Sequence, residues 1–258
     1  MTTMTSAHTA VPEARTKANR VWNAARLQFT NGWQSIGLPW LVLAIIFFAY
    51  LAIWVILYTS TSGQDRKDLS DGLQYSGATW YIFVYMLVVA IQAIARTFPF
   101  ALGLSVTRRD FYLGTSLAFV IFSVIYGCGL TLLSYLEDWT GGWGVGGRMF
   151  TAVYYGSGPF WQRLFIFVSI FLFFFFVGMA SATLYVRWKA TGLLSFGAVL
   201  LALGVGLIAL ATWSHSWERV GEWFATSGSV GVVAWMLAPT VLAAVVGYFV
   251  LRRATPKN

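Results

Sequence analysis

Long apolar stretches alternate with short polar segments along most of the chain. Each stretch is long enough to supply the roughly 20 apolar residues that a helix needs to cross a hydrocarbon core about 30 Å thick. Within lipid such a segment has to be helical, because only then are its backbone N–H and C=O groups paired. The predicted spans are 38–58, 79–104, 113–136, 163–186, 193–212 and 230–251. The pattern therefore predicts an all-α, polytopic membrane protein with six transmembrane helices.

The overall composition agrees with lipid as the main solvent. Of the 258 residues 58% are hydrophobic and only 10% are charged, against about 25% charged residues in soluble domains. Such a chain cannot cover itself with a polar surface. Cys128 is the single cysteine, so the chain cannot form an internal disulfide.

Two further stretches are amphipathic and too polar to span. On a helical wheel of residues 18–36, one narrow arc is apolar and the opposite side is polar. The apolar arc consists of Ala18, Trp22, Ala25, Phe29, Trp33 and Ile36. This pattern predicts an interfacial helix over 16–37, with either an anchoring or a mechanical role. Residues 213–224 predict a second amphipathic or re-entrant helix on the outer side, between spans five and six.

The basic residues divide unequally between the two sides that six spans would create. Twelve fall on the side of the termini, namely Arg15, Lys17, Arg20, Arg26, Arg96, Arg108, Arg109, Arg187, Lys189, Arg252, Arg253 and Lys257. The other five are Arg66, Lys67, Arg148, Arg163 and Arg219. By the positive-inside rule we expect both termini in the cytoplasm. The net charge of +8 is thus explained by topology, and no nucleic-acid partner is expected.

The same pattern predicts how the chain is divided. We expect a disordered cytoplasmic tail over 1–15, the interfacial helix over 16–37, the six-helix transmembrane domain over 38–251 and a second cytoplasmic tail over 252–258. The polar leader before the first span does not fit a cleavable signal peptide.

The run Phe171–Phe176 is interpreted as a lipid-facing band.

Catalytic motifs are missing from the sequence. No G-x-x-x-x-G-K-[ST] phosphate loop occurs, and Gly142, Gly144 and Gly147 match G-x-G-x-x-G without the strand that this motif requires. The two histidines, His8 and His215, do not form a zinc motif. We therefore expect no enzymatic activity, cofactor or metal in this chain. The predicted spans also lack central charges, which argues against ion-driven transport.

The segment "SVTRRDFYLGT" (105–115) contains an apparent contradiction. Thr107 followed by Asp110 predicts a capping box at the start of a helix. Arg108 and Arg109 then lie in its first turn, where the helix dipole disfavours each cation by about 0.3–1 kcal/mol. Two explanations stay open: the arginines fix the topology, or they contact an acidic surface on a partner.

The chain resembles a known family in three features: the pattern of its spans, its amphipathic helices and the segment "RTFPFALGLSVTRRDFYLGTSLA" (96–118). It is similar to the permease (membrane-spanning) subunits of type-2 ATP-binding cassette (ABC) exporters, particularly actinobacterial ones. The glutamate-alanine-alanine loop of importer permeases is missing. The resemblance implies an exporter that moves a hydrophobic or amphipathic substrate outward, such as a lipid or drug. The chain would then lie in a bacterial plasma membrane, and ATP and Mg would be bound by a separate cytosolic ATPase.

The resemblance also implies a coupling loop that docks on that ATPase. Carried over by position, its residues are Arg96, Phe98, Pro99, Phe100, Arg108, Arg109, Asp110 and Phe111. Pro99 and Gly103 are expected to end the second span there. A second permease copy is implied, as a homodimer or heterodimer, while the substrate and its contact residues stay unidentified. The alternatives are a membrane scaffold or sensor without transport and, less favoured, a secondary transporter.

Overall fold

The computed structural model describes residues 17–30, 32–62, 65, 69 and 71–253. The predicted tail 1–15, residues 254–258 of the second tail and the charges of Arg66 and Lys67 lie outside this part. Its elements are α1 (Lys17–Phe29), η1 (Trp33–Gly37), α2 (Leu38–Ser60), α4 (Trp80–Gly103), α5 (Arg108–Trp139), η2 (Gly142–Gly146), α6 (Phe160–Trp213) and α7 (Trp217–Arg252). The described part is helical and contains no strand, which confirms the predicted all-α class.

Within the described residues, five helices are long and apolar enough to cross a membrane. They are Trp33–Ser60, α4, α5, α6 and α7. The predicted spans 38–58 and 79–104 agree with α2 and α4 to within two residues. The length and apolar composition of these helices support the predicted membrane character.

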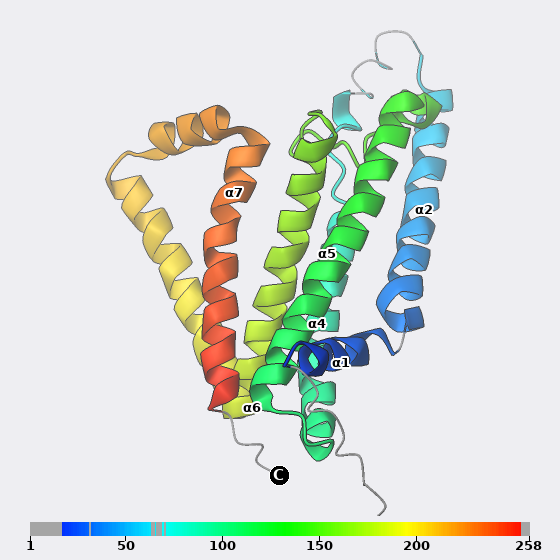
Figure 1. Ribbon diagram of the computed structural model, residues 1–258. Coiled ribbons are helices and arrows are strands. Elements are labelled where there is room, and N and C mark those ends of the chain that lie inside the picture. The colour runs from blue at the N-terminus through cyan, green and yellow to red at the C-terminus, as the bar shows by residue number, and fades with distance from the viewer. Residues whose placement is uncertain (1–16, 31, 63–64, 66–68, 70, 254–258) are drawn as a thin grey trace, which may run out of the picture.

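Helix α6 consists of two arms. Its 54 residues would extend about 80 Å as a straight helix, far more than a hydrocarbon core about 30 Å thick. Lys189 interrupts the helix with φ 58° and ψ −150°, and the chain reverses near this point (Figure 1). Gly228 (φ 59°, ψ −177°) breaks α7 in the same way. The part of α7 before Gly228 lies across the top of the view in Figure 1, and the rest runs back down.

Helices α4, α5 and the first arm of α6 enclose an aromatic core. Phe83 packs on Phe171 with ring centroids 4.7 Å apart, and Phe119 stacks on Phe175 at the same distance. Phe171, Phe175 and Phe176 are buried. The interpretation of Phe171–Phe176 as a lipid-facing band is therefore wrong for these three side chains. Six consecutive residues, here five phenylalanines and Leu172, point in all directions around a helix, so part of the run necessarily faces the neighbouring helices.

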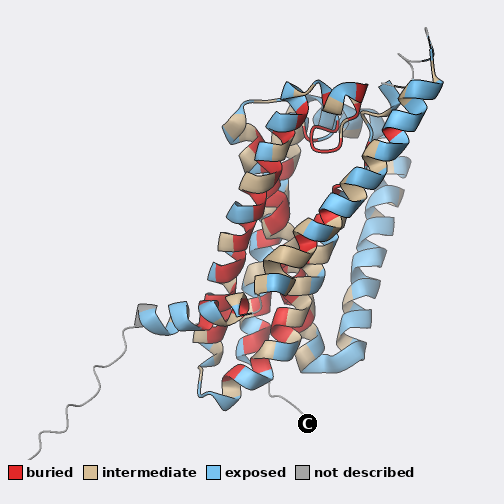
Figure 2. Cartoon of the chain, turned by 90° about the vertical axis from the view of Figure 1, so that its right-hand side faces the viewer, coloured by how far each residue is buried: buried red, intermediate tan, exposed pale blue. Residues whose placement is uncertain are grey.

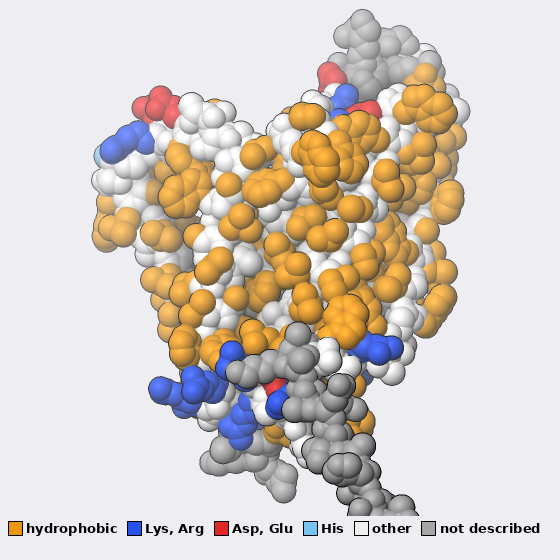
Figure 3. All heavy atoms as spheres, in the orientation of Figure 1, with side chains coloured by type: hydrophobic (Ala, Val, Ile, Leu, Met, Phe, Trp, Pro, Cys, Tyr) orange, Lys and Arg blue, Asp and Glu red, His pale blue; other side chains and the backbone are white. Residues whose placement is uncertain are grey.

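The outer faces of the molecule are apolar. Figure 2 shows that buried residues gather in the central helices, whereas much of α2 is exposed. On the second arm of α6, Leu194 and Leu201 are each 71% exposed. In Figure 3 hydrophobic side chains cover the middle of the visible face, and Lys and Arg side chains gather at its lower end. A continuous apolar surface of this extent fits a lipid environment.

Helix α1 lies across the lower ends of the longer helices (Figures 1 and 2). It is shorter than the predicted helix over 16–37, because it ends at Phe29 and a separate π-helical turn, η1, follows. Ala24 and Ala25 are buried, whereas Trp22 is 50% and Trp33 66% exposed. The small residues thus pack on protein while these two indoles face outward. The indole is suited to a membrane interface because it combines an apolar ring with a polar N–H group.

Candidate functional site

The connection between α4 and α5, residues 104–107, is here called the α4–α5 turn. It lies beyond the level of α1 at the lower end of the view in Figure 1. The Ser105 N–H donates to the Leu102 carbonyl (3.0 Å) and the Val106 N–H to the Ala101 carbonyl (3.1 Å). With Ser105 at φ 60°, these bonds form a Schellman motif that closes the end of α4.

Two expectations for this helix end have different outcomes. Pro99 lies inside α4 and does not end it, so that prediction is wrong. Gly103 is the last residue of α4, but the left-handed position belongs to Ser105. A left-handed conformation costs a non-glycine residue roughly 1–2 kcal/mol, and the two backbone hydrogen bonds of the motif offset that cost. The turn is therefore fixed by backbone bonding.

The start of α5 matches the predicted cap. Thr107 is extended (φ −70°, ψ 148°), and its hydroxyl oxygen accepts a hydrogen bond from the Asp110 N–H at 3.1 Å. An N-cap of this kind satisfies one of the free N–H groups at a helix start. The prediction that Thr107 opens a helix ahead of Asp110 is thereby confirmed.

Arg108 reaches from the α4–α5 turn to the end of α7. Its Nη1 donates to the Arg252 carbonyl at 3.3 Å, and Arg252 is the last residue of α7. A cation is favoured at a helix C-terminus, where carbonyl groups lack partners within the helix. Arg108 is thus unfavourably placed for the dipole of α5 and favourably placed for that of α7. This contact offsets part of the dipole cost noted for Arg108 in the sequence.

The residues predicted to contact a partner fall into two groups. Phe98 and Phe111 are completely buried and pack on each other, with ring centroids 5.4 Å apart. In this conformation they support the turn from inside and cannot touch another protein. The exposed residues are Arg96, Pro99, Phe100 and Arg109, while Arg108 and Asp110 are half-buried. A partner could therefore reach only a subset of the predicted contact residues.

A recess of about 430 Å³ separates the α4–α5 turn from α1. It is lined by Arg20, Asn23, Ala24 and Leu27 of α1, by Leu104, Ser105, Val106 and Thr107 of the turn, and by Asp110. The turn and α1 thus form one surface that carries both basic and acidic side chains.

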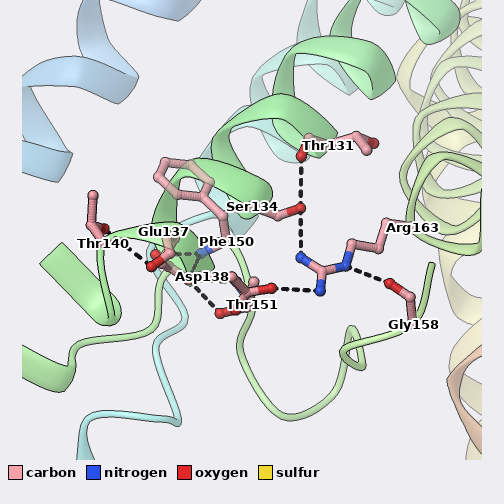
Figure 4. Close-up of polar contacts among 9 residues, drawn as sticks. All are labelled: Thr131, Ser134, Glu137, Asp138, Thr140, Phe150, Thr151, Gly158 and Arg163. Carbon is pink, nitrogen blue, oxygen red and sulfur yellow. Dashed lines mark hydrogen bonds and ion pairs between the residues drawn. The ribbon is translucent and has the colours of Figure 1, made fainter. Parts of the chain in front are cut away.

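A second polar cluster, which the sequence did not reveal, lies at the far end of α5 (Figure 4). Glu137 is completely buried. Its carboxyl oxygens accept hydrogen bonds from the Trp143 indole (2.8 Å), from the Thr151 hydroxyl (2.6 Å) and from the N–H groups of Met149, Phe150 and Thr151 (2.7–3.1 Å). A buried carboxylate is tolerable only with such full pairing. Glu137 therefore fixes the loop that connects α5 to α6.

Arg163, at the start of α6, completes this cluster. Its Nη2 lies 2.5 Å from the Asp138 carboxylate, its Nε donates to the Gly158 carbonyl (2.8 Å) and its Nη1 to the Ser134 hydroxyl (3.2 Å). Arg163 is only 6% exposed, whereas the side chain of Asp138 is 37% exposed. The sequence showed these residues only as charges on the outer side. The two buried charged groups, Glu137 and Arg163, are thus paired with groups of the protein itself, which indicates a structural role.

Two tyrosines in the same loop carry perturbed hydroxyl groups. Burial raises the pKa of Tyr154, whose hydroxyl donates to the Ser76 carbonyl. Burial also raises the pKa of Tyr155 well above its usual value. Both hydroxyls therefore remain protonated at neutral pH.

Among the described residues, no group of three or more His, Cys, Asp or Glu side chains could hold a metal ion.

Comparisons with known proteins give no family assignment. No protein-family model, no curated protein and no solved structure matches the chain.

Proposed function

We propose that the chain is the membrane-spanning subunit of an ATP-driven exporter of the ABC type, acting with a separate cytosolic ATPase. The observation that carries this proposal is the contact between Arg108, beside the exposed α4–α5 turn, and the end of α7. A partner that pushes on the turn would move the start of α5 and the end of α7 together. A contact between two helices beside an exposed turn suits a subunit that converts motion at its surface into motion between helices.

The membrane topology is part of the same proposal. If the two arms of α6 cross separately, the chain crosses six times, with α1 and the end of α7 on one side. Lys and Arg side chains gather at that end (Figure 3). The positive-inside rule then assigns this end to the cytoplasmic side of the membrane, which in this proposal is a bacterial plasma membrane. The α4–α5 turn would face a cytosolic ATPase, and the segment of α7 before Gly228 would lie along the outer surface.

The transport cycle would depend on a second permease copy beside this one. Closing of two ATPases around ATP and Mg would shift the pair between inward- and outward-facing states. An apolar helix surface favours a hydrophobic or amphipathic substrate over an ion, since a buried ion requires polar or charged ligands. The chain itself would carry out no chemistry.

Purification from the native membrane tests the proposal. An ATPase should copurify with the tagged chain, and the purified complex should hydrolyse ATP in the presence of Mg. The Arg219→Glu variant of the chain should still give this activity, whereas the Arg109→Glu variant should lose it. Both variants reverse one exposed arginine, but only Arg109 adjoins the α4–α5 turn. A complex with a partner that does not hydrolyse ATP would favour a scaffold or sensor. Transport driven by an ion gradient without an ATPase would favour a secondary transporter.

A further inference from the structure

A groove runs between α1 and α5 at the end of the molecule where α1 lies. Its volume is about 630 Å³, within the range of about 300–1,000 Å³ that is typical of small-molecule sites. The groove is lined by Trp22, Arg26, Leu27 and Phe29 of α1 and by Ile121 of α5, together with the polar Asn23 and Thr30. We call this site the α1 groove.

The position of the α1 groove follows from how α1 packs on α5. A Cβ atom on Gly114 would lie 2.6 Å from the Ala24 Cβ and 2.7 Å from the Val21 carbonyl oxygen, so the two helices are in close contact there. Further along, the rings of Phe29 and Phe122 are 4.5 Å apart. Ile121 lies seven residues beyond Gly114, or about 10 Å along α5 toward the interior of the bilayer. The groove thus extends from the level of α1 into the apolar zone.

The lining changes from charged to apolar along this direction. Arg26 is exposed and lies in the last turn of α1, and no acidic side chain among the described residues lines the groove to neutralise it. Leu27, Phe29 and Ile121 provide an apolar wall. Trp22, which is 50% exposed, supplies the kind of aromatic ring that is enriched at the interface between lipid and water.

We propose that the α1 groove binds one anionic phospholipid from the leaflet in which α1 lies. The lipid phosphate pairs with Arg26, and an acyl chain lies along Leu27, Phe29 and Ile121. A phospholipid fits better than a soluble ligand, because the apolar wall lies at a depth where acyl chains are the surrounding medium. A negative headgroup complements the single cation of the lining. This proposal requires only membrane insertion and does not depend on transport.

The charge of Arg26 is tested by lipid retention. The chain is purified in detergent, incubated with equal amounts of phosphatidylglycerol and phosphatidylcholine, and examined by native mass spectrometry. We expect one retained phosphatidylglycerol and no comparable retention of phosphatidylcholine. Arg26→Gln should weaken phosphatidylglycerol binding about five-fold, the factor that corresponds to about 1 kcal/mol per basic residue near a membrane. Arg26→Lys should largely restore it.

Two further variants distinguish a built site from general attraction. Arg253→Gln removes an exposed cation that does not line the groove, and it should leave lipid retention unchanged. Ile121→Trp should fill the apolar part and displace the lipid while Arg26 is intact. The proposal is overturned if Arg26→Gln retains as much phosphatidylglycerol as the unmodified chain, or if Arg253→Gln reduces retention equally. Equal retention of phosphatidylcholine would also overturn it. Should Arg26→Gln fail to fold, the result for Ile121→Trp decides.

Discussion

The Arg108 guanidinium donates to the carbonyl of Arg252 across 144 positions of sequence. This bond joins the first residue of α5 to the last residue of α7, and the neighbouring Arg109 is exposed. Two adjacent arginines that look equivalent in the sequence therefore differ in their surroundings. One stabilises a contact between helices, and the other is available to a partner.

This difference predicts unequal effects on stability. Arg108→Ala should lower the free energy of unfolding by about 0.5–1.5 kcal/mol, because the last carbonyl of α7 loses a charged donor. Arg109→Ala should change it by less than about 0.5 kcal/mol, as is usual for an exposed side chain. Chemical unfolding in one detergent checks both variants. Equal effects would show that the bond to Arg252 contributes nothing.

The contact of α1 with α5 depends on the absence of a side chain at Gly114. Gly114→Ala should destabilise the protein by about 1–3 kcal/mol, because the added methyl group would overlap backbone atoms of α1. Gly197→Ala is the matched control, since a Cβ atom there has no neighbour within 4 Å. Thermal unfolding compares the two variants. A Gly114→Ala protein as stable as Gly197→Ala would contradict the described packing.

The buried Glu137 should be intolerant of a neutral replacement. Glu137→Gln keeps the shape but replaces one acceptor oxygen with an amide donor that faces other donors. We expect a loss of about 1–3 kcal/mol in the free energy of unfolding. Glu222→Gln makes the same change at an exposed position and should be neutral within about 0.5 kcal/mol. If the two variants have the same free energy of unfolding, the hydrogen bonds to Glu137 do not stabilise the loop.

The proposed topology makes a prediction for cysteine labelling in intact cells. In a Cys128→Ala background, single cysteines at Ser62 and Ser157 should react with a membrane-impermeant maleimide. Cysteines at Ser105 and Ala190 should react only after the cells are opened. All four positions are exposed, so protection would report the membrane rather than burial. Labelling of the cysteine at Ser105 in intact cells would show that the orientation is opposite to the proposed one. The α4–α5 turn could then not contact a cytosolic partner.

Local patterns predicted the parts of the fold that depend on local interactions. The continuous apolar runs located α2 and α4, and the spacing of Thr107 and Asp110 located the start of α5. These features follow from hydrophobic length and from a cap within four residues. The sequence also indicates the break in α6 at Lys189, because a short polar gap lies there between the predicted spans 163–186 and 193–212.

The features that the sequence did not reveal depend on distant residues. Glu137 looked like an ordinary outer charge, because its donors lie 6 to 14 residues away in an irregular loop. Arg108 looked misplaced because its acceptor belongs to the end of α7. The burial of Phe98 and Phe111 follows from their mutual packing, which no periodicity within one helix indicates. Tertiary contacts of this kind override what each segment suggests alone.

Site-specific cross-linking tests the central claim, that the α4–α5 turn receives an ATPase. A photoreactive group is attached to a cysteine at Ser105 or, as the control, at Ser157, again in the Cys128→Ala background. The complex is then illuminated in native membranes, with and without Mg-ATP. We predict that Ser105→Cys cross-links to an ATP-hydrolysing protein with a yield that depends on nucleotide, and that Ser157→Cys does not. The absence of any such product from Ser105→Cys in a correctly inserted chain, or the same ATPase product from both positions, would contradict the account.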